Sequence, residues 1–240
     1  RNAVGSYNLW SSSSSRDVWL TAYAVGFMQD ARDNGFEVPE ASLDRSRQWL
    51  LEQVQQSSGA FGTWSANLKR GVESGRYDSS DANILREDHR RFAGLATAAL
   101  ALARDKKAPL STVRQLYDNY QERARSPLPL IQLAAAFKLM GDEGRMKSAL
   151  DQAVAREYGL NNRRNSGYYD EWLGDYGSGV RDYALAFAIA DKYELRHERL
   201  DNLLTQLASR LGNRSYLSTQ EQMSLLLAAR ALGGDKATPW

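Results

Sequence analysis

The stretch SPLPLIQLAAAFKLMGD (residues 126–142) predicts a helix that is apolar on almost every side. Between residues 128 and 140 only Gln132 and Lys138 interrupt the hydrophobic side chains, so no face of the helix is left for water. A helix of this kind is stable when other elements pack around it on several sides. The sequence therefore predicts a helix at the centre of a larger core.

Four further segments have the same character, namely residues 18–31, 92–103, 183–190 and 221–232. Between them lie segments with a single apolar stripe at helical spacing. No stretch alternates with period two for long enough to form a central strand, so the predicted class is all-α. The four stripes are Leu43, Leu50, Leu51 and Val54; Val113, Leu116, Tyr117 and Tyr120; Met146, Ala149, Leu150 and Ala153; and Leu200, Leu203, Leu204 and Leu207.

The alternation of buried and one-sided helices indicates two concentric rings, which is an α/α toroid of helical hairpins. Phe92 to Leu130 and Tyr183 to Met223 are both spaced by about 40 residues, the length of one hairpin with its loops. Longer intervals elsewhere predict extra loop, so we expect one domain over residues 1–240 with a polar insertion at about 65–91 and a second polar loop at 161–176. A closed ring of six pairs needs more helices, so we expect the first hairpin or hairpins to be missing. An open solenoid of helical repeats is the alternative.

Glycine- or serine-rich aromatic turns precede three of the buried helices. They are GSYNLW (5–10) before Arg16-Asp17, GYYDEW (167–172) before Arg181-Asp182, and RSYLSTQ (214–220) before the last helix. Asp, Ser and Thr are the side chains that cap helix N-termini. We therefore expect these helices to begin in similar ways.

Composition excludes several classes of protein. The chain has no Cys, which excludes a disulfide scaffold, a cysteine-ligated zinc site and a thiol nucleophile. Lys and Arg number 31 against 29 Asp and Glu. That balance, with Arg90-Arg91 and Arg163-Arg164 as separate pairs, does not favour nucleic-acid binding. No apolar run approaches the roughly 20 residues that span a bilayer.

The two histidines have no ligand or catalytic partner at an informative spacing. His89 lies in REDHRR (86–91), a stretch dense in opposing charges, so we expect a solvated residue at a helix start rather than a general base. His197, in ELRHERL (194–200), is expected on a loop between helices or in a first helical turn. Asp78, Asp81 and Asn83 offer oxygen atoms, but their spacing matches no calcium loop. We predict no metal, cofactor or catalytic residue.

Two features raise an enzyme as the alternative. QQSSGAFGTW (55–64) resembles the Gln-Trp repeat of triterpene cyclases, but no Asp-Asp-x-x-Asp run accompanies it, so we expect a turn between hairpins. Glycan-active toroids use paired acids in an aromatic cleft. The best candidates lie in the turn before a buried helix, and we expect them to be structural, like the serine loop at 11–15. These candidates are Asp170, Glu171 and Asp175, beside Tyr168, Tyr169, Trp172 and Tyr176.

Four stretches in a common order carry a family resemblance. They are RDVWLTAYAVGFMQDARDNGFEVPE (16–40), LYDNY (116–120) with 126–142, YGSGVRDYALAFAIA (176–190) and YLSTQEQMSLLLAARAL (216–232). Together they resemble the thioester-type helical domain of bacterial alpha-2-macroglobulins, a domain that is a toroid of six hairpins in complement component three. Its most specific element is Ser218-Thr219-Gln220, and the resemblance covers most of the chain outside 65–91.

The resemblance implies a structural and interaction domain without catalytic activity. Family members are large protease traps, in which a protease cuts a bait region and becomes enclosed. The implied partners are neighbouring macroglobulin domains and target proteases, not nucleic acid or a membrane. The implied location is the periplasm, with a lipid anchor on the full-length protein left open.

The chain departs from the family at the thioester. Many members form it from a Cys and a Gln at the start of this toroid, and this chain has no Cys. Gln220 belongs to the Ser-Thr-Gln turn, and residues 9–15 contain no His where complement component three has one that assists acyl transfer. Either the thioester segment lies upstream of Arg1 or the parent belongs to a branch without a thioester.

Overall fold

The computed structural model describes residues 4–8, 16–76, 78, 81–160, 173–212 and 214–233. The regular structure in these ranges is entirely helical, which confirms the all-α prediction. Its elements are α1 (Val18–Asp33), α2 (Glu40–Glu73), α3 (Ala82–Arg104), α4 (Leu110–Tyr120), the 3-10 turn η1 (Gln121–Arg123), α5 (Leu128–Leu139), α6 (Glu143–Ala155), α7 (Gly179–Lys192), α8 (Asp201–Leu211) and α9 (Thr219–Gly233).

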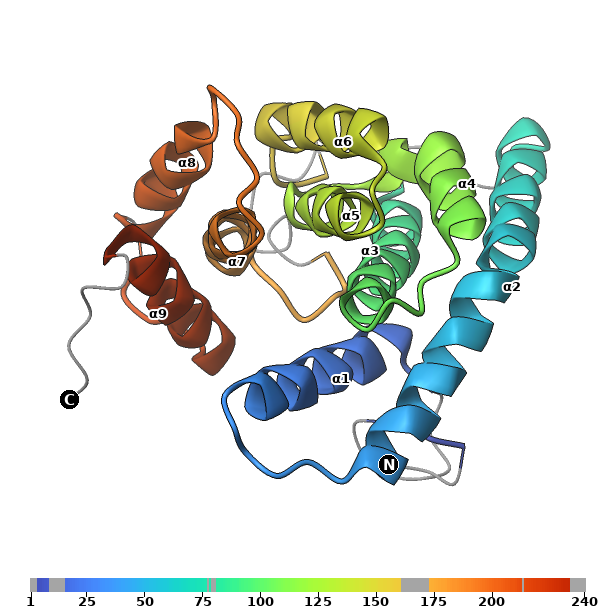
Figure 1. The fold of residues 1–240 in the computed structure, drawn as a ribbon. Coiled ribbons are helices and arrows are strands. Elements are labelled where there is room, and N and C mark those ends of the chain that lie inside the picture. The colour runs from blue at the N-terminus through green and yellow to red at the C-terminus, as the bar shows by residue number, and fades with distance from the viewer. Residues whose placement is uncertain are drawn as a thin grey trace.

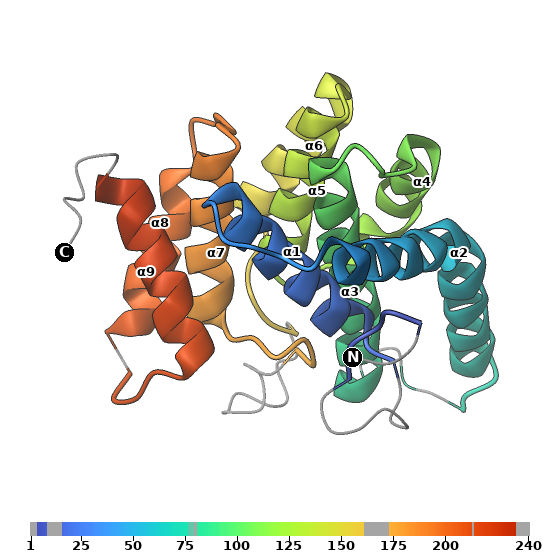
Figure 2. The same cartoon turned by 60° about the horizontal axis from the view of Figure 1, so that its bottom comes forward.

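The helices form an inner and an outer layer (Figure 1). The inner layer contains α1, α3, α5, α7 and α9, in which α3 packs on α1 and α5, and α7 packs on α5 and α9. The outer helices α2, α4, α6 and α8 lie outside them, with α6 against α5 and α8 against α7. Figure 2 shows α1 between the α7–α9 side and the α2–α3 side. The arrangement confirms a toroid of helical hairpins.

The helix α5 occupies the centre of this arrangement. Its residues from Leu128 to Phe137 are all buried, including Gln132, whose side-chain oxygen accepts a hydrogen bond from the Thr97 hydroxyl at 3.1 Å. Helices α3, α6 and α7 pack around it. The apolar surface that α5 carries on every side is therefore matched by neighbours, as the opening stretch of sequence predicts.

Residues 65–91 are mostly helical, which corrects the expected polar insertion there. Helix α2 runs on to Glu73 and α3 begins at Ala82, so only residues 74–81 connect them. Within the charged part of α3, Glu87 pairs with Arg90 and Arg91, each at 2.8 Å. Ion pairs three and four residues apart stabilise the surface of a helix. High charge at this position therefore marks a helical surface and not a loop.

The segment QQSSGAFGTW (55–64) lies inside α2, which corrects the predicted turn. Phe61 is buried, and its ring meets the edge of Tyr120 from α4 at 4.4 Å between centroids. The Trp64 indole Nε1 donates to Asp88 Oδ1 on α3 at 2.7 Å. The aromatic spacing therefore holds α2 against both neighbours.

The inner layer is least closed between α1 and α9 (Figure 1). Tyr23 Oη lies 3.5 Å from Met223 Sδ and bridges the two helices. Phe27, one turn beyond Tyr23, is 68% exposed, and Leu226 and Leu232 on α9 are each 61% exposed. Apolar side chains are therefore exposed on both of the inner helices that border this opening. No helix in the described ranges combines the length and apolar composition needed to cross a membrane.

The central position of α5 can be tested with a pair of phenylalanine substitutions. Phe137 is fully buried in α5 and Phe36 is 70% exposed. Phe137→Ala is expected to lower the free energy of unfolding by about 3–5 kcal/mol, because it leaves a cavity in the core. Phe36→Ala is expected to change it by less than about 0.5 kcal/mol. Urea unfolding of both variants measures the difference, and equal effects would contradict the central role of α5.

Candidate functional site

A buried ionic cluster lies where α7 begins, within the sequence DYGSGVRD (175–182). Ser178 caps α7 by accepting from the Arg181 N–H at 3.3 Å, so the helix begins one turn before Asp182. The cap is a serine, one of the three side-chain types expected at these helix starts, and Asp182 lies in the first turn of the helix. His89, Asp175, Arg181 and Asp182, here called the Arg181 cluster, are fully buried.

The Arg181 guanidinium is the centre of the cluster. Its Nη2 donates to Asp175 Oδ2 at 2.7 Å, and its Nη1 donates to the Asp175 main-chain carbonyl at 2.7 Å. Its Nε donates to Asp182 Oδ1 at 2.7 Å, and Nη2 lies 2.6 Å from the same oxygen. A charge without solvent contact persists only when partners of this kind surround it. Arg181 thereby fixes both carboxylates and the segment before α7.

His89 is buried and belongs to this cluster, which corrects its prediction as a solvated residue. Its Nε2 lies 3.4 Å from Asp175 Oδ2, and its Nδ1 accepts the main-chain N–H of Arg125 at 3.0 Å. Its neighbour Asp88 is buried too, and Oδ2 of Asp88 pairs with Arg123 at 2.6 Å. The charged stretch 86–91 therefore has one face in solvent and one inside the protein.

The two carboxyl groups of the cluster have opposite pKa shifts. Burial alone would raise the pKa of Asp175, but the Arg181 and His89 side chains hold that pKa well below its usual range. Burial raises the pKa of Asp182, and the Asp175 carboxylate adds to this effect against the attraction of Arg181. Burial would lower the pKa of Arg181, but both carboxylates raise it. Arg181 therefore stays charged and Asp175 is its ionised partner.

The cluster brings together side chains of the types that bind metal ions. Ligand atoms of His89, Asp175 and Asp182 all lie within 4.8 Å of one another. The Arg181 guanidinium already donates to both carboxyl groups, so it supplies the positive charge that a metal ion would bring. Chemically, the arrangement is an internal ion network that joins helices.

Aromatic side chains cover the cluster. The Arg181 guanidinium lies over the Trp19 ring at 5.4 Å, and the Tyr176 ring lies 5.2 Å from Trp19. Tyr176 has a left-handed backbone with φ of 62°, and its hydroxyl donates to Asp17 Oδ2 at 3.0 Å. Burial and the Asp17 carboxylate raise the pKa of Tyr176 to about 12. Asp17 also caps α1 by accepting from the Leu20 N–H, so the starts of α1 and α7 are joined.

The Ser-Thr-Gln turn joins the starts of α7 and α9. Glu221 Oε2 accepts the Ser218 N–H at 2.8 Å, while Ser218 Oγ accepts the Glu221 N–H at 3.3 Å. This reciprocal pair is a capping box. Glu221 Oε1 also accepts from the Ser178 hydroxyl at 2.6 Å, and Ser178 is the cap of α7. The motif therefore fixes the ends of two inner helices.

The remaining candidate residues have structural contacts. His197 lies in the loop between α7 and α8, as predicted, with Nε2 2.9 Å from Asp151 Oδ1. Asp81 caps α3 by accepting the Asn83 N–H at 2.8 Å. Some candidates lie outside the described residues. These are residues 11–15, Arg163, Arg164, Tyr168, Tyr169, Asp170, Glu171 and Trp172.

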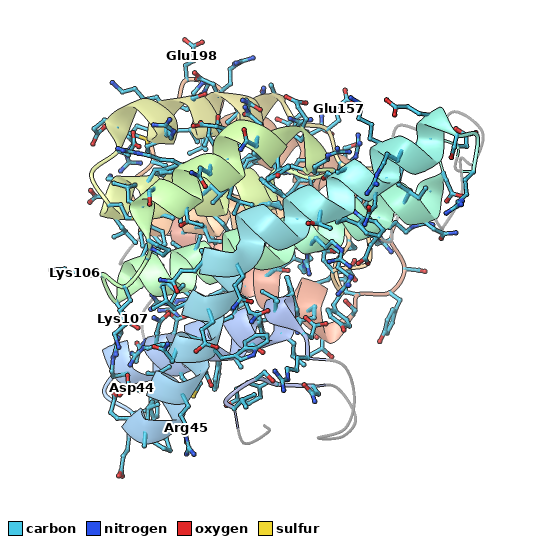
Figure 3. The ribbon with its side chains drawn as sticks, turned by 90° about the vertical axis from the view of Figure 1, so that its right-hand side faces the viewer. Asp44, Arg45, Lys106, Lys107, Glu157 and Glu198 are labelled. Carbon is cyan, nitrogen blue, oxygen red and sulfur yellow. The ribbon has the colours of Figure 1, made fainter. Side chains whose placement is uncertain are left out.

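Two surface hollows in the described part of the chain lack the residues needed for acid–base catalysis by paired carboxyl groups. One of about 320 Å³ lies between α2 and the loop after α3, where Asp44, Arg45 and Lys107 share one edge of the molecule (Figure 3). Asp44 already pairs with Lys107 at 3.3 Å. The other, of about 370 Å³, is lined by Glu157 together with Arg156 and Arg199, among others. Neither offers the pair of facing carboxyls that glycoside hydrolysis requires.

Comparisons with known proteins agree with this geometry. Residues 1–81 match the family described as the A-macroglobulin TED domain. The chain is 34% identical over 230 residues to an alpha-2-macroglobulin of Escherichia coli strain K12, covering 95% of this chain and 12% of that protein. It thus spans about an eighth of that relative's length.

Solved structures are similar along the whole chain. Native E. coli alpha-2-macroglobulin, from domain MG7 to the C-terminus, matches with a TM-score of 0.76 at 32% identity, covering 100% of this chain and 33% of that one. Salmonella alpha-2-macroglobulin reacted with methylamine matches with a TM-score of 0.74 at 32% identity, covering 99% and 13%.

The Arg181 cluster is the feature that sequence reasoning missed. The pair Arg181-Asp182 is visible in the sequence, but its partners His89 and Asp175 are 86 residues apart. The glycines on both sides of Ser178 are the available signal. A Cβ on Gly177 would overlap the Arg181 guanidinium, so the segment passes so close to the arginine that only glycine fits.

That close approach predicts opposite effects for two glycine substitutions. Gly177→Ala is expected to lower the free energy of unfolding by about 3 kcal/mol, because it displaces a buried, paired guanidinium. Gly26→Ala, inside α1 with open space around it, is expected to raise it by about 0.5–1 kcal/mol. Urea unfolding distinguishes them, and a neutral Gly177→Ala would show that the guanidinium position is not critical.

Proposed function

This chain belongs to the bacterial alpha-2-macroglobulin family as a TED domain, and on that basis we propose that it is a structural and interaction domain of a protease trap. The observation that carries the proposal is the similarity of the whole ring of helices to that domain, from α1 to α9. In this proposal the full-length protein encloses the protease, and the helical domain contributes contacts and conformational change.

The chemistry of the described residues supports a role without catalysis. Asp175, the described member of the predicted acid cluster, is fully buried and pairs with Arg181 at 2.7 Å. A general acid or nucleophile must instead reach its substrate. The ionisable groups at the start of α7 hold helices together. A domain that moves as a unit during a conformational change requires such internal contacts.

The exposed apolar side chains support a role in contact with other domains. Phe27, Leu226 and Leu232 beside the opening, together with Tyr216 in the turn before α9, are more than half exposed. Apolar surface of this kind commonly marks an interaction site. We assign these side chains to contacts with neighbouring macroglobulin domains of the same protein, and the protein itself to the periplasm.

A trap predicts a size-dependent protection of substrates by the full-length protein. A protease held inside a large molecule keeps its active site, so it should still cleave a small peptide while a large protein substrate is spared. Trypsin mixed with the full-length protein, assayed on both substrates, measures this. An unrelated protein of equal mass is the control, and equal cleavage of the large substrate in both mixtures would refute the trap.

A second measurement determines whether the trap is covalent. The chain has no Cys, so a thioester in the full-length protein requires a Cys outside these 240 residues. Methylamine would attack such a thioester, form an amide with the Gln-derived acyl group and release the Cys thiol. Intact mass before and after treatment is expected to rise by one methylamine if this domain shields a thioester. An unchanged mass in the folded protein assigns it to the thioester-free branch.

A further inference from the structure

The Arg181 cluster contains two carboxyl groups but only one side chain with a permanent positive charge. All four of its members, His89, Asp175, Arg181 and Asp182, are buried. With both carboxyls ionised, the cluster would carry a net negative charge without solvent contact unless His89 were protonated. An uncompensated buried charge is strongly unfavourable, and such groups take up a proton instead. One further proton is therefore required within the cluster.

The hydrogen bonds of His89 place that proton elsewhere. Nδ1 of His89 accepts the main-chain N–H of Arg125 at 3.0 Å, so Nδ1 carries no hydrogen. Imidazolium has a hydrogen on both nitrogens and cannot accept this bond. His89 is therefore neutral, with its hydrogen on Nε2, which faces Asp175 Oδ2 at 3.4 Å.

The contacts of the two carboxyl groups assign the proton to Asp182. Asp175 has donors from two residues on Oδ2, Arg181 and His89, which stabilise its ionised form. Asp182 has donors from one residue, Arg181, on Oδ1. The second oxygen of each carboxyl group, Oδ1 of Asp175 and Oδ2 of Asp182, is buried without a hydrogen-bond partner among the described residues. The buried Ser126 hydroxyl faces Asp182 and likewise has no such partner. A hydrogen bond between Asp182 and Ser126 would satisfy both groups with either one as the donor, so the proton is assigned by the charge balance of the cluster and by the smaller number of donor residues on Asp182.

We propose that Asp182 is a neutral carboxylic acid in the folded domain at neutral pH, and that the Arg181 cluster is a proton-dependent clasp between α3 and α7. His89 lies on α3, Arg181 and Asp182 lie on α7, and Ser126 lies in the segment before α5. When Asp182 releases its proton to water, the cluster gains a negative charge that these elements cannot compensate. Opening the joint then hydrates that charge.

The surroundings of Asp182 support this direction. The charged or titratable groups that act on it are Arg181 on its own helix, Asp175 before that helix and His89 on α3, with the Ser126 hydroxyl beside them. Burial together with Asp175 raises the pKa of Asp182 above its usual value, against the opposite effects of Arg181, Ser126 and His89. The closed joint therefore binds a proton that the open joint loses.

The sign of the pH dependence follows from this difference in bound protons. Between the pKa of Asp182 in the open joint, about 3.9, and its raised value in the closed joint, each pH unit favours opening about tenfold. Below that window both forms are protonated, and above it both are ionised. The clasp therefore weakens as pH rises.

Hydrogen exchange of the full-length protein, read by mass spectrometry on peptides covering α7 (Gly179–Lys192), measures the opening directly. After correction for intrinsic exchange, the wild type is expected to lose protection by about tenfold per pH unit as the pH rises above about 5, until Asp182 ionises in the closed joint as well. Asp182→Asn, which imitates the neutral acid, is expected to lose this slope.

Asp142→Asn is the matched control. Asp142 caps α6, and although burial opposes it, Arg114 and the Arg145 N–H lower its pKa, so it stays ionised across this range. This variant is expected to keep the wild-type slope. Parallel profiles for the wild type and Asp182→Asn would overturn the proposal. If Asp182→Asn does not fold, a wild-type profile that is flat with pH overturns it alone.

Discussion

A guanidinium without solvent contact must find its counter-charge inside the protein, and Arg181 imposes this constraint on the whole structure. The segment before α7 must pass close enough for Asp175 to pair with it, and Gly177 makes that approach sterically feasible. His89 brings α3 to the same point, and Trp19 of α1 covers it. One buried charge therefore determines where three inner helices meet.

A second ionic network fastens the opposite end of α3. Asp105, which follows α3, accepts from Arg47 of α2 at 2.6 Å and from Arg32 of α1 at 3.1 Å. Between the two networks lies the apolar length of α3 and α5, where hydrophobic packing predominates and Thr97 donates one hydrogen bond to Gln132. Ion pairs thus hold the helices at both ends of α3, and hydrophobic contacts hold them in the middle. The ion pairs determine where the helix ends lie, whereas hydrophobic burial supplies the stability of the core.

Periodicity predicted the helices that carry an apolar stripe or an apolar run, because burial acts on every residue of a repeating pattern, but it did not reveal that α2 continues to Glu73. The stripe at Leu43 and the apolar run at Leu128 both lie on helices of the predicted kind. Polar composition did not indicate the secondary structure of residues 65–91. Charged side chains can be solvated in a loop, but they can equally form ion pairs on a helix, as Glu87 and Arg90 do. The site escaped prediction because His89 and Asp175 become neighbours only through the packing of α3 against the segment before α7.

The distribution of charge also supports the proposed role of this domain in contacts with other domains. An active site leaves its reactive groups short of partners until substrate arrives, whereas Asp175 and Arg181 already complete each other. Among the described residues, apolar side chains such as Phe27 of α1 and Leu226 of α9 are exposed on the two helices that border the opening of the ring. Contacts made there bear on α1 and α9, and Asp17 and Glu221 connect the starts of both helices to α7. A contact at the opening would therefore act on two helices whose starts are already hydrogen-bonded to Tyr176 and Ser178, beside the Arg181 cluster.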